Sequence, residues 1–90
     1  MHTVKKDNTQ VLVLKIAELR EPESMAAARI SLHKGEVVSI EGTDMSLHSE
    51  GGLVIFVADG VRNEIKRPVE RVLAAIAENG TADRILAVLA

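Results

Sequence analysis

The histidines of this chain are the first candidates for chemistry, because imidazole can act as a metal ligand and as an acid or base near neutral pH. They are His2, His33 and His48. None lies three or four residues from another histidine or from a carboxylate on an expected helix, the spacing typical of metal ligands. Cysteine is absent, which excludes thiolate-held zinc, iron–sulfur clusters and disulfides. We therefore expect surface or turn histidines, with no metal and no cofactor.

A serine nucleophile would need a base and an orienting acid close by. Asp44, Ser46 and His48 alternate along one expected strand and would share a face. Neighbours two apart on a strand are about 6–7 Å apart, too far for a hydrogen-bonded relay without a second element. No Gly-x-Ser-x-Gly elbow is present, and Gly51-Gly52 and Asp59-Gly60 precede strands instead of the helix N-termini that bind phosphates. The sequence thus predicts no catalytic residue, and a protein that is not an enzyme.

Four basic residues follow one another closely near the end of the expected sheet. They are Arg62, Lys66, Arg67 and Arg71. Together they could form a patch that contacts nucleic acid. Glu64 and Glu70 are interleaved and are expected to pair with them, and Phe56 is the only aromatic residue, so no platform for stacking bases exists. Nucleic-acid binding is therefore the alternative function, not the leading one.

The charge balance also disfavours phosphate binding. The net charge is −2, and residues 21–60 carry two basic against seven acidic side chains. Proteins that bind phosphates electrostatically carry a surplus of Lys and Arg on one face. The acidic middle of the chain is typical of an ordinary solvated surface.

Ninety residues, 47% hydrophobic and 27% charged, indicate one folded domain that covers residues 1–90. The polar residues 1–8 are expected to be a flexible arm. No apolar run approaches the roughly 20 residues of a membrane span, so we expect no membrane contact and a cytoplasmic location. A signal peptide built on residues 11–17 is the less favoured alternative, because its removal would delete a strong strand candidate.

The first half of the chain shows short apolar segments separated by turn residues. Residues 10–19 carry apolar side chains at both odd and even positions, which fits a strand covered on both faces or a helix. Residues 21–28 favour a short helix or turn. Three short strands then follow: residues 29–33, 36–41 and 45–49, with Lys34-Gly35 as a tight hairpin turn between the first two.

The strongest local pattern predicts a hairpin of strands 53–58 and 61–66 around the turn Asp59-Gly60. Strand 53–58 is apolar on both faces, as in a central strand, whereas 61–66 carries charges on one face, as in an edge strand. A helix then begins near Pro68, with the apolar stripe Val69, Val72, Leu73 and Ile76. Gly80 is expected to end it in a left-handed conformation, and Thr81 to cap a second helix that runs to the C-terminus.

These elements predict an α+β fold: a mostly antiparallel meander of four to six strands within residues 10–66, followed by two helices. Two short helices are too small to cover all the apolar surface that we expect. Apolar side chains would remain exposed on the second sheet face and on the last helix. We expect this surface, at Leu53, Ile55, Val57, Val88 and Leu89, to form a protein interface. The sequence therefore indicates a small non-catalytic protein-interaction or regulatory module, acting on a protein partner, on itself as a homodimer, or both. A hairpin followed by an amphipathic helix is too common to identify a family.

Overall fold

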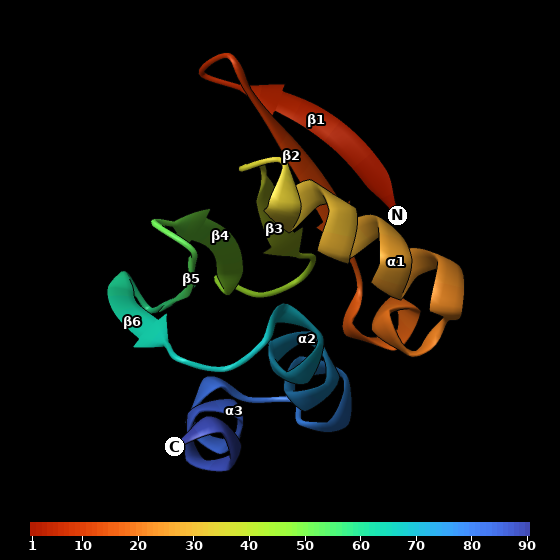
Figure 1. Cartoon of the computed structure of the whole chain (residues 1–90). Coiled ribbons are helices and arrows are strands. Elements are labelled where there is room, and N and C mark those ends of the chain that lie inside the picture. Colours follow the sequence, from red (N-terminus) through yellow and green to blue (C-terminus); the bar gives the residue numbers. More distant parts are fainter.

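A computed structural model describes all residues 1–90 and contains one six-stranded sheet whose strands lie in chain order. The strands are β1 (His2–Lys6), β2 (Thr9–Leu14), β3 (Val37–Ile40), β4 (Ser46–Glu50), β5 (Leu53–Ala58) and β6 (Val61–Ile65). The helices are the 3₁₀ helix η1 (Ile16–Arg20), α1 (Pro22–His33), α2 (Val69–Glu78) and α3 (Ala82–Leu89). This confirms the predicted α+β class, with a mostly antiparallel sheet followed by two helices (Figure 1).

The sheet departs from a simple meander between β2 and β3, which pair in parallel. Parallel neighbours need a long crossover connection, and η1 and α1 supply it. The strand predicted at residues 29–33 is therefore wrong, because these residues are the second half of α1. The helix that the preceding alanines favour continues through this segment. Ala28 and Leu32 lie one turn apart on the helix, and both are buried in the core.

Lys34-Gly35 ends this helix and does not form the predicted hairpin turn. Gly35 has a φ of 80°, its N–H donates to the Leu32 carbonyl, and the Glu36 N–H donates to the Ser31 carbonyl. This pair of bonds is the Schellman C-cap, which requires a left-handed residue and favours glycine. Gly35 thus ends a helix, whereas the sequence predicts that it closes a hairpin.

Residues 1–8, predicted as a flexible arm, contain β1 and its turn. β1 pairs antiparallel with β2 around Asp7 and Asn8, whose φ angles are 51° and 66°. Asp and Asn tolerate the left-handed region better than other side chains, so this dipeptide can close a two-residue hairpin. The sequence allows either a strand or a helix for residues 10–19. The structure has both there, β2 followed by η1.

The predicted C-terminal hairpin is confirmed in its register. Ala58 pairs with Val61 and Phe56 with Asn63, around Asp59 and Gly60, which have φ angles of 52° and 74°. β6 is an edge of the sheet and β5 an interior strand, as expected.

All the helices cover one face of the sheet (Figure 1). From the sheet, the core includes Leu12, Leu14, Val38, Ile40, Leu47, Val54, Phe56, Ala58 and Ile65. From the last two helices it includes Val72, Leu73, Ile76, Ile85 and Leu89. The core positions alternate along each strand, so the intervening residues lie on the opposite face, on which no helix packs. We call this second surface the open face.

The two C-terminal helices begin as predicted but are separated differently. Pro68 directly precedes α2, and the Thr81 hydroxyl accepts a hydrogen bond from the Arg84 N–H at the start of α3. Gly80 does not adopt a left-handed conformation. Instead, Asn79 ends α2, because its backbone N–H and its side-chain Nδ2 both donate to the Ala75 carbonyl. No helix of the protein has the length and apolar character needed to span a bilayer.

Candidate functional site: the open face of the sheet

The open face has an apolar part near the β1–β2 hairpin. A hollow of about 530 Å³ lies here, and its apolar lining consists of Val4, Val11, Val13 and Val37. The cross-strand pairs Val4–Val11 and Val11–Val37 place these side chains on one surface. Val4 is 43% exposed, and the other three are half-buried although no helix covers them.

Polar and charged side chains complete the lining of this hollow. Ser39 and Ser46, a cross-strand pair of β3 and β4, contribute hydroxyls. Lys6 and Asp7 come from the end of the β1–β2 hairpin, and Asp44 from the connection between β3 and β4. The hollow thus combines an aliphatic surface with charges of both signs.

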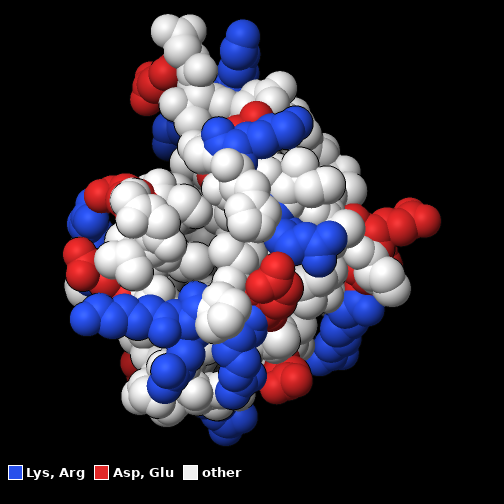
Figure 2. All heavy atoms as spheres, in the orientation of Figure 1, with Lys and Arg blue, Asp and Glu red and all other residues white.

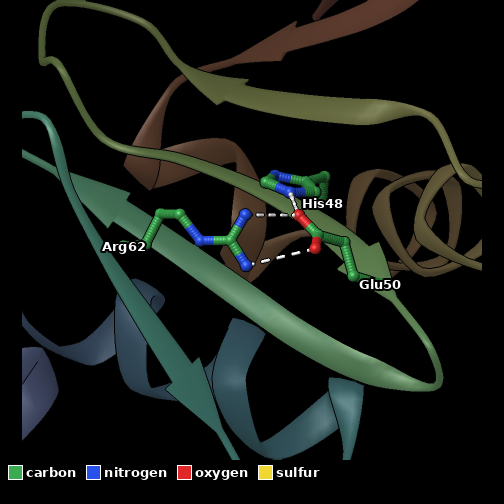
Figure 3. Close-up of polar contacts among 3 residues, drawn as sticks. All are labelled: His48, Glu50 and Arg62. Carbon is green, nitrogen blue, oxygen red and sulfur yellow. Dashed lines mark hydrogen bonds and ion pairs between the residues drawn. The ribbon is translucent and has the colours of Figure 1, made fainter.

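The other half of the open face carries a polar cluster of His48, Glu50 and Arg62 (Figure 3). Arg62 donates two hydrogen bonds to the Glu50 carboxylate, with Nη1–Oε2 and Nη2–Oε1 distances of 2.7 and 3.1 Å. His48 Nε2 lies 2.6 Å from Glu50 Oε2. The Arg62 hydrogen bonds, followed by that of His48, lower the pKa of Glu50 from 4.5 to about 2. The same ion pair raises the pKa of Arg62.

This cluster connects strands that are not neighbours. Glu50 lies on β4 and Arg62 on β6, so their side chains meet across β5. Ile55 of β5 faces the same side, opposite His48 and Glu64 in the register, and is only 1% exposed. Since no helix packs on this face, the side chains that surround Ile55 on the sheet itself must bury it.

Two acidic residues connect the turns at one end of the sheet. The Asp44 Oδ2 accepts a hydrogen bond of 2.6 Å from the Asp59 N–H, which joins the β3–β4 connection to the β5–β6 turn. The nearby Asp44 carboxylate, chiefly through a side-chain hydrogen bond, raises the pKa of Asp59.

Asp44, Ser46 and His48, the candidate acid, nucleophile and base, do not come together in the structure. Ser46 and His48 share the open face of β4, but His48 is held by Glu50, and Asp44 lies before the strand with its carboxylate on the Asp59 backbone. No group of three or more His, Asp or Glu side chains is arranged to hold a metal ion.

The predicted interface residues fall on two different sides of the molecule. Leu53, Ile55 and Val57 lie on the open face, Ile55 buried and the other two half-buried. Val88 is 39% exposed on α3, on the side of the sheet that the helices cover, and Leu89 belongs to the core. The structure therefore does not unite these five residues into one surface, because the last helix docks on the domain itself.

The four residues of the predicted basic patch differ in their partners. The Arg62 guanidinium is held by Glu50 and not by Glu64, its neighbour in the sequence. Lys66, Arg67 and Arg71 are exposed and form no ion pair, and Glu70 pairs with none of them. Arg67 donates to the Ala90 carbonyl.

Sequence reasoning missed two features of the open face. The aliphatic hollow depends on β1, which was expected to be a flexible arm; the alternation of Val11 and Val13 was the available signal. The polar cluster depends on Glu50, two residues after His48 and therefore on the same face of a strand. Comparison with protein families, with curated proteins and with solved structures finds no match for this chain.

Proposed function

We propose that this protein is a small, non-catalytic interaction module that self-associates and binds a protein partner on the open face of its sheet. The observation that carries this proposal is the aliphatic hollow at the β1–β2 hairpin. A sheet face without helices normally presents mainly polar side chains to water. Here, four valines are placed next to one another on it.

The chemistry of the hollow favours a protein ligand. Apolar centres with a polar rim are typical of protein–protein interfaces. Its volume of about 530 Å³ can accept several apolar side chains. The Lys6, Asp7 and Asp44 side chains at its boundary offer charges of both signs, which suits a polypeptide better than a uniformly anionic ligand.

The polar cluster supports a structural role over a catalytic one. The Glu50 carboxylate accepts from two donors, and its low pKa leaves it ionised at neutral pH, so it is a weak general base. His48 is bound to this carboxylate and has no hydrogen bond to a serine or threonine hydroxyl. A nucleophile–base pair within hydrogen-bond reach is what covalent catalysis needs.

The test is capture of partners by the tagged full chain from a lysate of its native host, with and without nuclease. We expect a stoichiometric protein that survives nuclease treatment. Val11→Glu places a charge in the hollow and should reduce recovery at least about tenfold, the effect of losing roughly 1.4 kcal/mol. Gln10→Glu is the matched control, because Gln10 is exposed and lies on the other face of β2. Equal recovery with a folded Val11→Glu variant would contradict binding at the hollow.

Nucleic-acid binding is the second candidate function. Figure 2 shows Lys and Arg side chains gathered near the connection between β6 and α2, and Lys66, Arg67 and Arg71 lie in this part of the chain. If they bind phosphates, the logarithm of the affinity should fall linearly with the logarithm of the salt concentration. Lys66→Gln with Arg71→Gln should then lower both the affinity and the salt slope in a mobility-shift titration. No binding at low salt would exclude this candidate.

A further inference from the structure

The edge strand β6 has backbone groups that no neighbour satisfies. In a two-residue hairpin, the residues that flank the turn exchange both backbone hydrogen bonds, and hydrogen-bonded pairs then alternate along the ladder. Val61, Asn63 and Ile65 therefore direct their N–H and C=O groups toward β5. Those of Arg62 and Glu64 point outward from the sheet.

The sequence of β6 is complementary to itself when read antiparallel. Val61–Ile65 reads Val-Arg-Asn-Glu-Ile. With Asn63 opposite its own copy, Arg62 of one chain lies opposite Glu64 of the other, and Val61 lies opposite Ile65. Opposite charges that face each other across strands stabilise a pair, and like charges destabilise it. Charged edge strands normally resist pairing, but in this register the charges of two copies are complementary.

The same register brings together the residues that carry the outward backbone groups. Arg62 and Glu64 would exchange both backbone bonds with Glu64 and Arg62 of the other chain, while the two Asn63 residues form the non-hydrogen-bonded pair at the centre. Backbone pairing and charge pairing thus select one register.

Apolar surface beside β6 fits the same arrangement. Val61 is 58% exposed, more than any other large hydrophobic residue of the chain. A hollow of about 430 Å³ lies between β6 and α3, and its apolar lining includes Ile65, Leu86 and Leu89. Val61 of a second copy, placed opposite Ile65, would lie at this hollow and lose its exposure to water.

The other edge of the sheet lacks these properties. β1 has the sequence His-Thr-Val-Lys-Lys and carries two lysines and no acidic residue. Its self-pairing would bring together four lysines without a compensating charge. Edge lysines are a common protection against strand pairing. The two edges of this sheet are therefore not equivalent.

We propose that two copies of this chain associate through antiparallel pairing of their β6 strands, centred on Asn63, into one continuous sheet. This inference rests on the self-association in the proposed function and specifies its surface. A two-fold axis perpendicular to the sheet relates the copies, so both open faces lie on the same side. The dimer then offers two hollows to one partner or to two.

The first experiment measures the mass of the full chain in solution by sedimentation velocity over a range of concentrations. The wild type should sediment with twice the mass of the chain. Glu64→Pro removes an outward N–H and leaves the β5–β6 bonds in place, and it should raise the dimer dissociation constant at least about tenfold. Lys5→Pro, at the corresponding outward position of β1, is the matched control and should leave the mass unchanged. Circular dichroism verifies that both variants are folded.

A charge exchange tests the register itself. Arg62→Glu and Glu64→Arg each place like charges opposite one another in a homodimer, so each variant alone should dissociate. Mixed together, they place opposite charges at both positions and should form a heterodimer that is at least about tenfold tighter than either homodimer. Failure of the mixture to associate would overturn the proposed register.

The outcomes separate this inference from the function on which it rests. A wild-type chain that stays monomeric at high concentration would contradict self-association altogether. A wild-type dimer that Glu64→Pro leaves intact would retain self-association and refute β6 as its surface. In that case, Val57→Glu on the open face would test the other available surface.

Discussion

At the scale of single residues, the Glu50 carboxylate is the most strongly perturbed group of the open face. Its low pKa has a defined cause, two hydrogen bonds from Arg62 and one contact with His48. We predict that carbon-detected NMR of the Glu50 carboxyl gives a midpoint near pH 2. Arg62→Met should move this midpoint most of the way back toward 4.5, and His48→Gln should move it less. A wild-type midpoint near 4.5 would show that the ion pair does not persist in solution.

The same contact makes the folding stability depend on pH. Because folding depresses the pKa of Glu50, its contribution is fully present above pH 4.5 and is lost as the pH falls toward 2. Urea unfolding should therefore show a larger loss of stability between pH 5 and 2 for the wild type than for Glu50→Gln. The difference should be small, since Glu50 and Arg62 are about half exposed.

Ile55 shows that burial on this face does not require a helix. We predict that Ile55→Ala lowers the free energy of unfolding by about 2–4 kcal/mol, as for a core residue. Val57→Ala, two residues along the same face but half-buried, should cost less than about 1.5 kcal/mol. Urea denaturation followed by circular dichroism measures both. Equal costs would mean that the polar cluster does not seal Ile55. A charge at Ile55 would thus report on folding, whereas a charge at Val57 would test whether this part of the open face is an interface.

At the scale of the elements, the β5–β6 turn depends on glycine for its backbone conformation alone. A Cβ at Gly60 would meet no atom within 4 Å, but its φ of 74° is costly for other residues. We predict that Gly60→Ala lowers the free energy of unfolding by about 1–2 kcal/mol. Gly80→Ala is the control, because Gly80 is equally uncrowded and has no positive φ, so its effect should stay within about 0.5 kcal/mol. Thermal unfolding of both variants tests this, and a similar loss in both would contradict it.

The elements that sequence patterns predicted are those with local signals. The β5–β6 hairpin has alternating apolar residues around Asp59-Gly60, and α2 has its stripe behind Pro68. The parallel pairing of β2 with β3 could not be predicted, since it joins segments separated by a whole helix. Lys34-Gly35 was ambiguous, because a left-handed glycine serves a hairpin turn and a helix C-cap equally well.

The candidate site was less predictable than the fold. That Leu53, Ile55 and Val57 share a second face follows from strand periodicity alone, and the structure agrees. That Arg62 meets Glu50 rather than Glu64 does not, because the contact depends on the order of three strands in space. The separation of Val88 and Leu89 from that face likewise depends on where α3 docks.

At the scale of the whole molecule, order should decrease from the middle of the sheet to β1. All five residues of β1 are exposed, and the strand pairs only with β2. We predict that the β1 amides exchange with deuterium fastest among the strands, and that those in β5 exchange slowest, because they require opening of the core. Exchange followed by NMR on the wild type tests this, and protection of β1 equal to that of β5 would contradict it.

Phe56 gives this molecule an uncommon spectroscopic property. It is the only Phe, Tyr or Trp in the chain, it is fully buried, and its register partner Leu47 is buried as well. Apart from the weaker ring currents of the three histidines, ring-current shifts of methyl resonances in the folded core therefore originate from one known phenyl ring. Each strongly shifted methyl identifies a direct neighbour of Phe56, so a one-dimensional proton spectrum reports how the centre of the core is packed. Loss of those shifted lines would signal loosening of the core before the secondary structure changes.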